Sequence, residues 1–299
     1  MSEWGSDPDS RRALQRLIFR CASDYMLDEA GVLAARHEGD FVRAITWLAM
    51  LQVGDGEQRP ISVRALSRSL NLPFETTRRK VRELEASGHC QLASGHRPMA
   101  MRLDPEAARA DAARCIEGYQ RLMAAMETLG MGPEVFLAGP PPPPAADQAA
   151  AQMAAHRLIQ GFLLRTLEAG THPHGSMVNA LIFVGLMSAN AAAITNDPLL
   201  ARRYAGADTP PPDSLRPPAR PRQIAERLCL PYEIVRRRLL HFVERGWVEK
   251  VGGGYRCRVE RMQEPALLAA GLAICQRFAQ LVQAVAGVGL AMPARARAA

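Results

Sequence analysis

The chain repeats part of its own sequence. Residues 64–91 align with residues 222–249 at an offset of 158, without a gap and with eight identities in 28 positions. The identical pairs are Arg64/Arg222, Leu70/Leu228, Leu72/Leu230, Pro73/Pro231, Glu75/Glu233, Arg78/Arg236, Arg79/Arg237 and Gly88/Gly246. Two units of this length indicate an internal duplication and a pseudo-dimer, because a solenoid needs more and shorter repeats.

The match continues outward at other offsets. Val42, Ala44 and Ile45 align with Val178, Ala180 and Leu181 at an offset of 136, and residues 120–122 align with 276–278 at 156. The change from 136 to 158 places an insertion of 22 residues in the second half, around 196–219. Because residues 205–221 are rich in proline, we expect this insertion to be a disordered or extended loop.

A proline run separates the two halves. Pro140–Pro144 cannot continue a helix and favours an extended conformation, so residues 138–148 are predicted to be a linker. The predicted halves are 1–137, with its core at 40–104, and 149–299, with its core at 175–260.

The first half follows the order of a winged helix. Asp40 can cap a helix with apolar residues at Phe41, Ala44, Ile45, Leu48 and Leu51, which ends at Gly54-Asp55-Gly56. Ser62 can cap a short helix to Leu70, and the next helix buries Thr77, Val81 and Leu84 and ends at Gly88. Residues 90–94 and 99–103 alternate like strands around a turn at Gly95–Pro98.

The second half repeats this order. Its predicted elements are helices at 177–187, 221–229 and 232–245, strands at 247–251 and 255–259, and a turn at Gly252–Gly254. Long helices are expected before each unit, at 11–35 and 149–169, and after it, at 105–129 and 263–286. The predicted fold is therefore mainly α with small β-wings, in two tandem winged helix-turn-helix domains flanked by long helices and related by a pseudo-two-fold duplication.

Residues 72–88 and 230–248 resemble the turn and recognition helix of winged helix-turn-helix regulators of the MarR, IclR and GntR kinds. The outer helices resemble MarR dimerisation helices in their placement. The resemblance implies that the helix after each turn enters the major groove of DNA and that the wing touches the backbone or the minor groove. Two units in one chain and the 22-residue insertion depart from the MarR pattern.

Arginines gather on the predicted recognition helices. All but two of the 37 basic residues are arginine, and segments 62–88 and 220–246 carry net charges of +3 and +4 in a chain whose total is +7. Arginine can bond a guanine edge with two donors or clamp a phosphate. The predicted DNA contacts are Glu75, Thr76, Arg78, Arg79, Arg82 and Arg97 in the first half and Glu233, Ile234, Arg236, Arg237, Arg238, Arg256 and Arg258 in the second.

Other kinds of site are not indicated. The six cysteines form no C-x-x-C pair, and His172 and His174 have no neighbouring ligands, so we expect a loop there and no metal or cofactor. No catalytic motif is present, so no enzyme is expected. The polar residues 1–9 do not look like a signal peptide, and Gln276, Arg277, Gln280 and Gln283 interrupt the apolar stretch 266–292. We therefore expect a cytoplasmic, nucleoid-associated protein rather than a membrane protein.

Three functions are compatible with this pattern. The first is sequence-specific binding of double-stranded DNA by a transcription regulator, a repressor; the sequence does not show whether it has a small-molecule effector. The second is a plasmid-type replication initiator, and the third is a tandem winged-helix scaffold that binds protein. For the first we expect a monomer that binds two unequal half-sites, or alternatively a homodimer joined through the C-terminal helix.

Overall fold

The computed structural model describes residues 8–53, 59–137 and 139–292. Three predictions involve residues outside these ranges: the polar start of the chain, the helix-ending Gly54–Gly56 and the first linker residue. The first half contains α2 (Pro8–Arg36), α3 (Phe41–Leu51), α4 (Val63–Ser69), α5 (Phe74–Ala86), β1 (Cys90–Ala93), β2 (Arg97–Ala100), α6 (Pro105–Thr128) and the 3-10 turn η1 (Pro133–Val135).

The second half contains α7 (Gln148–His174), α8 (Met177–Thr195), α9 (Pro198–Arg203), η2 (Asp213–Leu215), α10 (Pro221–Leu228), α11 (Tyr232–Glu244), β3 (Val248–Val251), β4 (Gly254–Cys257), α12 (Val259–Met262) and α13 (Pro265–Gly287). The described chain is thus mainly helical with two small two-stranded sheets, as predicted. The order from α2 to α6 recurs from α7 to α13, with α9, η2 and α12 as additions.

Local signals start and end the helices as the sequence predicts. The Asp40 side chain accepts a hydrogen bond from the Arg43 amide at the start of α3, and Ser62 accepts one from Ala65 at the start of α4. Gly88 and Gly246, which end α5 and α11, have φ of 74° and 69°. Side chains rarely adopt this left-handed conformation, which explains why the duplicated position keeps glycine.

The first hairpin is tighter than predicted. Ala93 pairs with Arg97 and Cys90 with Ala100, so Arg97 and Pro98 belong to β2 instead of to the turn. Gly95 and His96 both have positive φ, at 74° and 55°, which lets the chain reverse within residues 94–96. In the second hairpin Gly254 pairs with Val251, which leaves Gly252 and Gly253 as the turn.

A third segment joins each hairpin at equivalent positions. Ala219 bridges Tyr255, and each amide donates to the other's carbonyl at 2.8 Å. Ile61 lies 158 residues before Ala219, and its amide donates to the carbonyl of Pro98 at 3.0 Å. The first unit makes one backbone hydrogen bond here and the second makes two, because Pro98 has no N–H to donate. The repeat therefore extends to a contact that the sequence alignment did not include.

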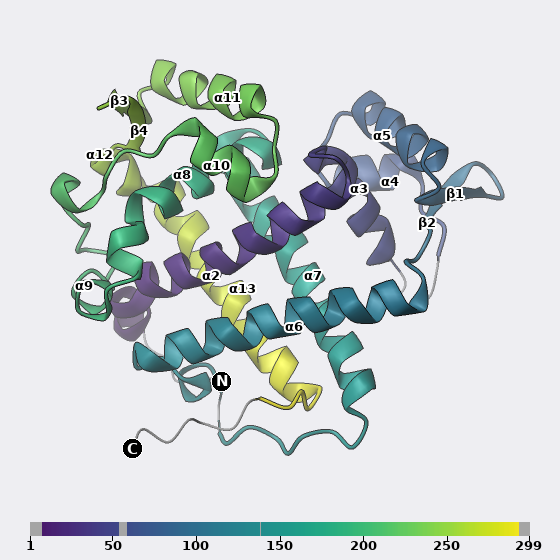
Figure 1. Ribbon diagram of the computed structural model, residues 1–299, viewed down its shortest axis with the longest axis horizontal. Helices are drawn as coiled ribbons and strands as arrows, with labels where there is room; N and C mark the ends of the chain where they lie inside the picture. Colours follow the sequence, from purple (N-terminus) through teal and green to yellow (C-terminus); the bar gives the residue numbers. More distant parts are fainter. Residues whose placement is uncertain (1–7, 54–58, 138, 293–299) are drawn as a thin grey trace.

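Long helices from both halves build one continuous core. α2 packs on α13, α8 and α10 of the second half as well as on α3 and α6, and α7 packs on α13, α8 and α6. At the centre, the ring of Phe278 meets the rings of Phe136 and Phe162 at 5.6 and 6.1 Å. In Figure 1 these long helices cross in the middle of the molecule, below α5 on one side and α11 on the other.

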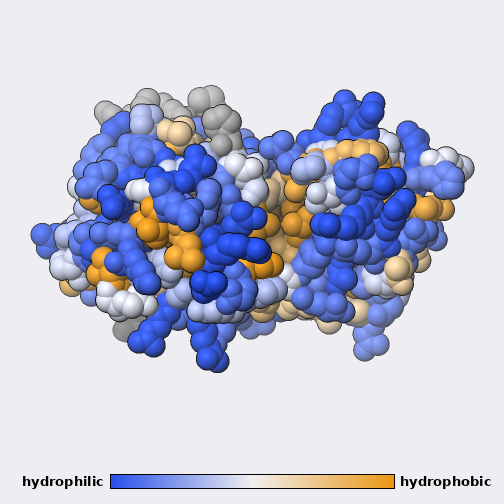
Figure 2. All heavy atoms as spheres, turned by 90° about the horizontal axis from the view of Figure 1, so that it is seen from above, coloured by the Kyte–Doolittle hydropathy of each residue, from blue (hydrophilic) through white to orange (hydrophobic). Residues whose placement is uncertain are grey.

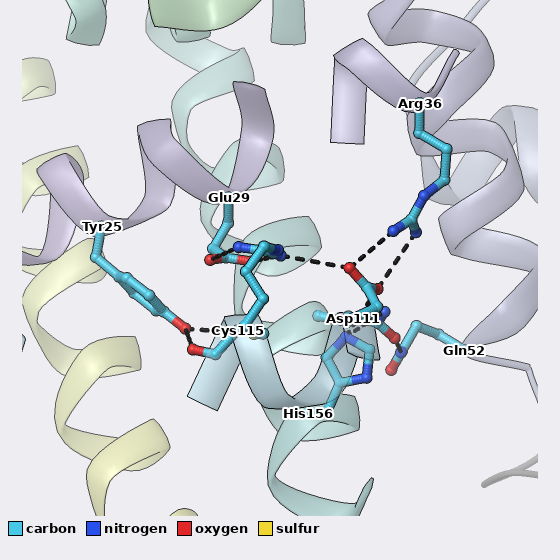
Figure 3. A network of polar contacts seen from close by, with 9 residues as sticks. Tyr25, Glu29, Arg36, Gln52, Asp111, Cys115 and His156 are labelled. Atoms are coloured by element: carbon cyan, nitrogen blue, oxygen red, sulfur yellow. Dashed lines mark hydrogen bonds and ion pairs between the residues drawn. The ribbon is translucent and has the colours of Figure 1, made fainter. Parts of the chain in front are cut away.

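A polar network at this crossing joins α2, α6 and α7 (Figure 3). The buried Asp111 carboxylate binds Arg36 of α2 at 2.7 Å and lies 3.3 Å from Nε2 of His156 of α7. Beside it, both terminal nitrogens of Arg114 donate to Glu29, at 2.9 and 2.8 Å. Burial alone would raise the pKa of Asp111, but the hydrogen bonds from His156 and Arg36 outweigh it and lower that pKa well below its usual range.

The insertion at 196–219 follows the extended-loop alternative of the prediction and also contains short helical segments. It contains α9 and η2, and its carbonyls at Ala201 and Tyr204 accept from the Arg20 guanidinium of α2 at 3.0 and 2.9 Å. Arg216 is 1% exposed and donates to the carbonyl of Cys257 at 2.7 Å. Hydrogen bonds from Arg20 to the insertion and from Arg216 of the insertion to β4 therefore attach this segment to the rest of the fold.

Two helices of the second half are longer than predicted. α7 runs to His174 instead of ending near residue 169, with Pro173 inside its last turn, and α8 runs to Thr195 instead of Met187. His174 is therefore helical and buried, not part of a loop. By length and composition α8 and α13 could each cross a membrane, but 61% and 39% of these stretches are buried within the chain.

The buried histidines at the ends of α2 and α7 have equivalent surroundings. His37 lies between Trp47 of α3 and His89, with ring centroids 5.4 and 5.0 Å away. His174 lies between Phe183 of α8 and Trp247, at 4.5 and 5.7 Å. Burial lowers the pKa of each imidazole to about 4. Each half thus places a neutral imidazole between two aromatic neighbours, although the residue types of those neighbours differ.

Candidate nucleic-acid interface

The faces of α5 and α11 divide as the periodicity predicts. α5 buries Thr77, Val81 and Leu84, and α11 buries Val235, Leu239 and Phe242. Among the predicted contacts, Glu75, Arg78, Arg79, Arg82, Glu233, Arg236 and Arg237 are exposed, while Thr76, Ile234 and Arg238 are partly buried. The exposed charges of both helices therefore lie opposite the sides that pack on the core.

An ion pair is repeated on the two helices. Nη2 of Arg78 lies 2.8 Å from Glu75, and Nη2 of Arg236 lies 3.0 Å from Glu233. Both pairs join the first turn of a helix to a residue three positions later, and the two arginine side chains are similarly exposed, at 46% and 44%. In each unit the carboxylate holds the guanidinium near the N-terminal end of the helix, where a recognition helix meets base edges.

Further along each helix the arginines are less constrained. Arg79 makes only a long pair with Glu83, at 3.7 Å. Arg82 and Arg237 are exposed and form no ion pair within the ranges that the structure describes. These side chains keep their charge in water and are free to reorient toward an anionic partner.

Lys80 was missed by the sequence analysis. It is 9% exposed, and its Nζ binds Asp40 at 2.5 Å and Glu83 at 2.6 Å. Asp40 also caps α3, so this lysine fixes the orientation of α5 on its neighbouring helix. Lys80 is adjacent to Val81 and three residues after Thr77. This helical spacing indicates that it lies on the face of α5 that packs on the core.

The wings contain three of the predicted contacts. Arg97, in β2, and Arg258, just after β4, are exposed and form no ion pair among the described residues. Arg256 is different, because its side chain is 15% exposed and binds Glu249 at 2.6 Å and Asp213 of the insertion at 3.0 Å. Unlike Arg78 and Arg236, it is largely buried and held between two carboxylates, which argues against the predicted phosphate contact.

Helices α5 and α11 lie on one side of the molecule. In Figure 1, α11 and α5 lie along the upper edge, with the two hairpins farther out on their flanks. Figure 2 looks down on that edge and shows two lobes with extensive hydrophilic surface, separated by a waist where hydrophobic residues are visible. The two Glu–Arg pairs therefore lie on the same side of the molecule.

The second unit also has a groove beside α11. It measures about 660 Å³ and is lined by residues from the N-terminal parts of α10 and α11 and from the wing turn. These include Arg220, Arg222, Tyr232 and Gly253. Arg222 pairs with Glu226 at 2.8 Å, and the groove opens to solvent between basic side chains.

Among the described residues, no cluster of three or more histidine, cysteine or acidic side chains could hold a metal ion. The six cysteines are free thiols, and only Cys229 is exposed. Asp111 and His156 form an acid–histidine pair, but both are buried in the helix crossing. The exposed arginine faces are therefore the strongest candidate site of the described structure.

Comparison with known proteins found no similarity that identifies the chain: no family model, no curated protein and no solved structure matches it.

Proposed function

We propose that this protein binds double-stranded DNA sequence-specifically, as a transcription regulator that acts as a repressor. The observation that carries the proposal is the Glu–Arg pair repeated on α5 and α11, two exposed helices on the same side of one chain. Arginine near the start of a recognition helix can bond guanine, and the neighbouring arginines can bind phosphates.

The proposal includes a tandem winged helix-turn-helix duplication. It is supported by the recurring element order and by the contact of a third segment with each hairpin, at Ile61 in the first unit and Ala219 in the second. In this arrangement α5 and α11 are the recognition helices, and the β1–β2 and β3–β4 hairpins are the wings. A pseudo-two-fold axis between the units directs both recognition helices to the same DNA face.

One chain supplies both recognition helices in this proposal. Regulators that bind successive major grooves need two such helices roughly 34–36 Å apart, which most obtain by dimerising. Here the apolar residues of α13, including Phe278 and Val282, are buried against other helices of the same chain. That burial favours a monomer that functions as a pseudo-dimer over a homodimer joined through α13.

The two half-sites should differ in sequence. Thr76 and Arg82 of α5 correspond to Ile234 and Leu240 of α11. One helix therefore offers a hydroxyl and a guanidinium where the other offers two apolar side chains. We expect a bound site without perfect two-fold symmetry.

Selection from a random duplex library, followed by fluorescence anisotropy on the selected and a scrambled duplex, tests the proposal. Tight binding of the selected duplex is expected, with log K falling against log salt at a slope of about −0.9 for each phosphate contact. Absence of duplex binding at low salt, or binding that does not respond to salt, would refute it. Equal affinity for both duplexes would remove the claim of sequence specificity.

A further inference from the structure

Two exposed aromatic side chains occupy equivalent positions in the two units. Phe74 is 44% exposed and Tyr232 is 47% exposed, and they are the first residues of α5 and α11. They lie 158 residues apart, which is the offset of the duplication. Aromatic exposure at the start of a recognition helix is therefore a feature of both units.

The fold covers these two side chains only in part. Each follows a proline at the N-cap, Pro73 or Pro231, and neither makes a ring–ring contact with any described residue. Burial of an aromatic side chain is favourable for folding, and both residues remain exposed, at 44% and 47%. A partner that covers the ring would recover that contribution.

The surroundings of the rings are basic. Phe74 is followed by the Glu75–Arg78 pair, and Tyr232 lines the groove that also contains Arg220 and Arg222. An apolar ring bordered by arginines suits the edge of a DNA major groove, which presents thymine methyl groups between two rows of phosphates. The charge complementarity selects DNA as the occupant over an apolar protein surface.

We propose that Phe74 and Tyr232 are specificity-determining residues, each packing its ring on the C5-methyl group of a thymine in its own half-site. The hydroxyl of Tyr232 in addition donates a hydrogen bond to a backbone phosphate, which Phe74 cannot do. This inference rests on the proposed DNA-binding function and deepens it. In this proposal each half-site contains a thymine recognised by the aromatic ring, in addition to the guanine recognised by Arg78 or Arg236.

Replacement of thymine by uracil tests the contact directly, because it removes only the methyl group. Each thymine of the selected duplex is replaced in turn, and affinity is measured for the unmodified chain and for Phe74→Ala and Tyr232→Ala. We expect a loss of about fourfold at one position in each half-site, the equivalent of one buried methyl group. The loss in one half-site should disappear in Phe74→Ala, and the loss in the other in Tyr232→Ala.

Two further variants complete the experiment. Tyr232→Phe should keep its uracil effect but bind all duplexes about threefold to tenfold more weakly, because one hydrogen bond is lost. Leu199→Ala is the matched control, since Leu199 is 81% exposed and lies on α9 away from both recognition helices. It should bind like the unmodified chain.

The outcomes separate the two proposals. A chain that binds no duplex overturns both of them. A chain that binds its selected duplex with full affinity after Phe74→Ala and Tyr232→Ala, and with no uracil effect at any position, overturns the aromatic contacts and leaves DNA binding intact.

Discussion

The two buried histidines predict how stability depends on pH. His37 and His174 are 0% and 4% exposed, and neither nitrogen of His37 has a hydrogen-bond partner among the residues that the structure describes. Burial lowers the pKa of both from 6.5 to about 4, so the folded chain keeps them neutral while the unfolded chain protonates them below pH 6.5. The free energy of unfolding must therefore fall as the pH decreases from about 6.5 to about 4. Below pH 4 this loss of stability is complete, because both imidazoles are then protonated in the folded chain as well.

The magnitude follows from the pKa difference. One pKa unit corresponds to about 1.4 kcal/mol, which limits the loss to about 3 kcal/mol per imidazole in full acid. Between pH 7 and pH 5 we expect a loss of about 1–2 kcal/mol per imidazole. The double variant His37→Phe, His174→Phe keeps an aromatic ring in both positions and removes both titrating groups.

Urea unfolding followed by circular dichroism at pH 7, 6 and 5 measures the effect. The unmodified chain should lose about 2–4 kcal/mol more than the double variant over this interval. His96→Asn is the matched control: His96 is exposed in a wing turn with φ of 55°, which asparagine tolerates, and it should show the pH dependence of the unmodified chain. Equal pH dependence for the double variant would refute the assignment of two neutral buried rings.

Four further outcomes are expected. Arg78→Ala and Arg236→Ala should each weaken binding of the selected duplex by about 1–3 kcal/mol, measured by anisotropy. An equal loss on scrambled DNA would show that these arginines bind phosphates instead of bases. No loss from either variant would reject their assignment. Arg256→Ala should lower thermal stability by about 1 kcal/mol in calorimetry and leave DNA affinity unchanged, because its ion pairs are internal; weaker DNA binding would restore it to the interface. Asp111→Asn should lower the free energy of unfolding, measured in urea at pH 7, by about 3–5 kcal/mol. The difference between the variant and the unmodified chain should shrink only below about pH 4, where the carboxylate of the unfolded chain becomes protonated. No change would show that the helix crossing does not depend on the ion pair. Light scattering should find one chain free in solution and one on a single defined duplex, and a stable dimer with a palindromic footprint would contradict the pseudo-dimer.

The sequence by itself determined the local architecture. The order of helices and hairpins, the caps at Asp40 and Ser62, the left-handed Gly88 and the buried face of α5 all follow from residues that are close together in the chain. A cap needs a side chain within three positions, and a helix face needs only a repeat of 3.6 residues. The exposed arginines of the candidate site were predicted for the same reason, since they lie opposite that buried face.

Only the tertiary structure decided which charged groups remain free. Arg256 alternates outward like an exposed strand residue, but an insertion more than 40 residues earlier supplies Asp213 to neutralise it. Lys80 is held by Asp40 from another helix, and Asp111 meets His156 and Arg36 from two others. The contacts of Ile61 and Ala219 with the two hairpins likewise depend on the tertiary structure. Such pairings depend on how distant segments approach one another in space, and neither periodicity nor composition encodes that distance.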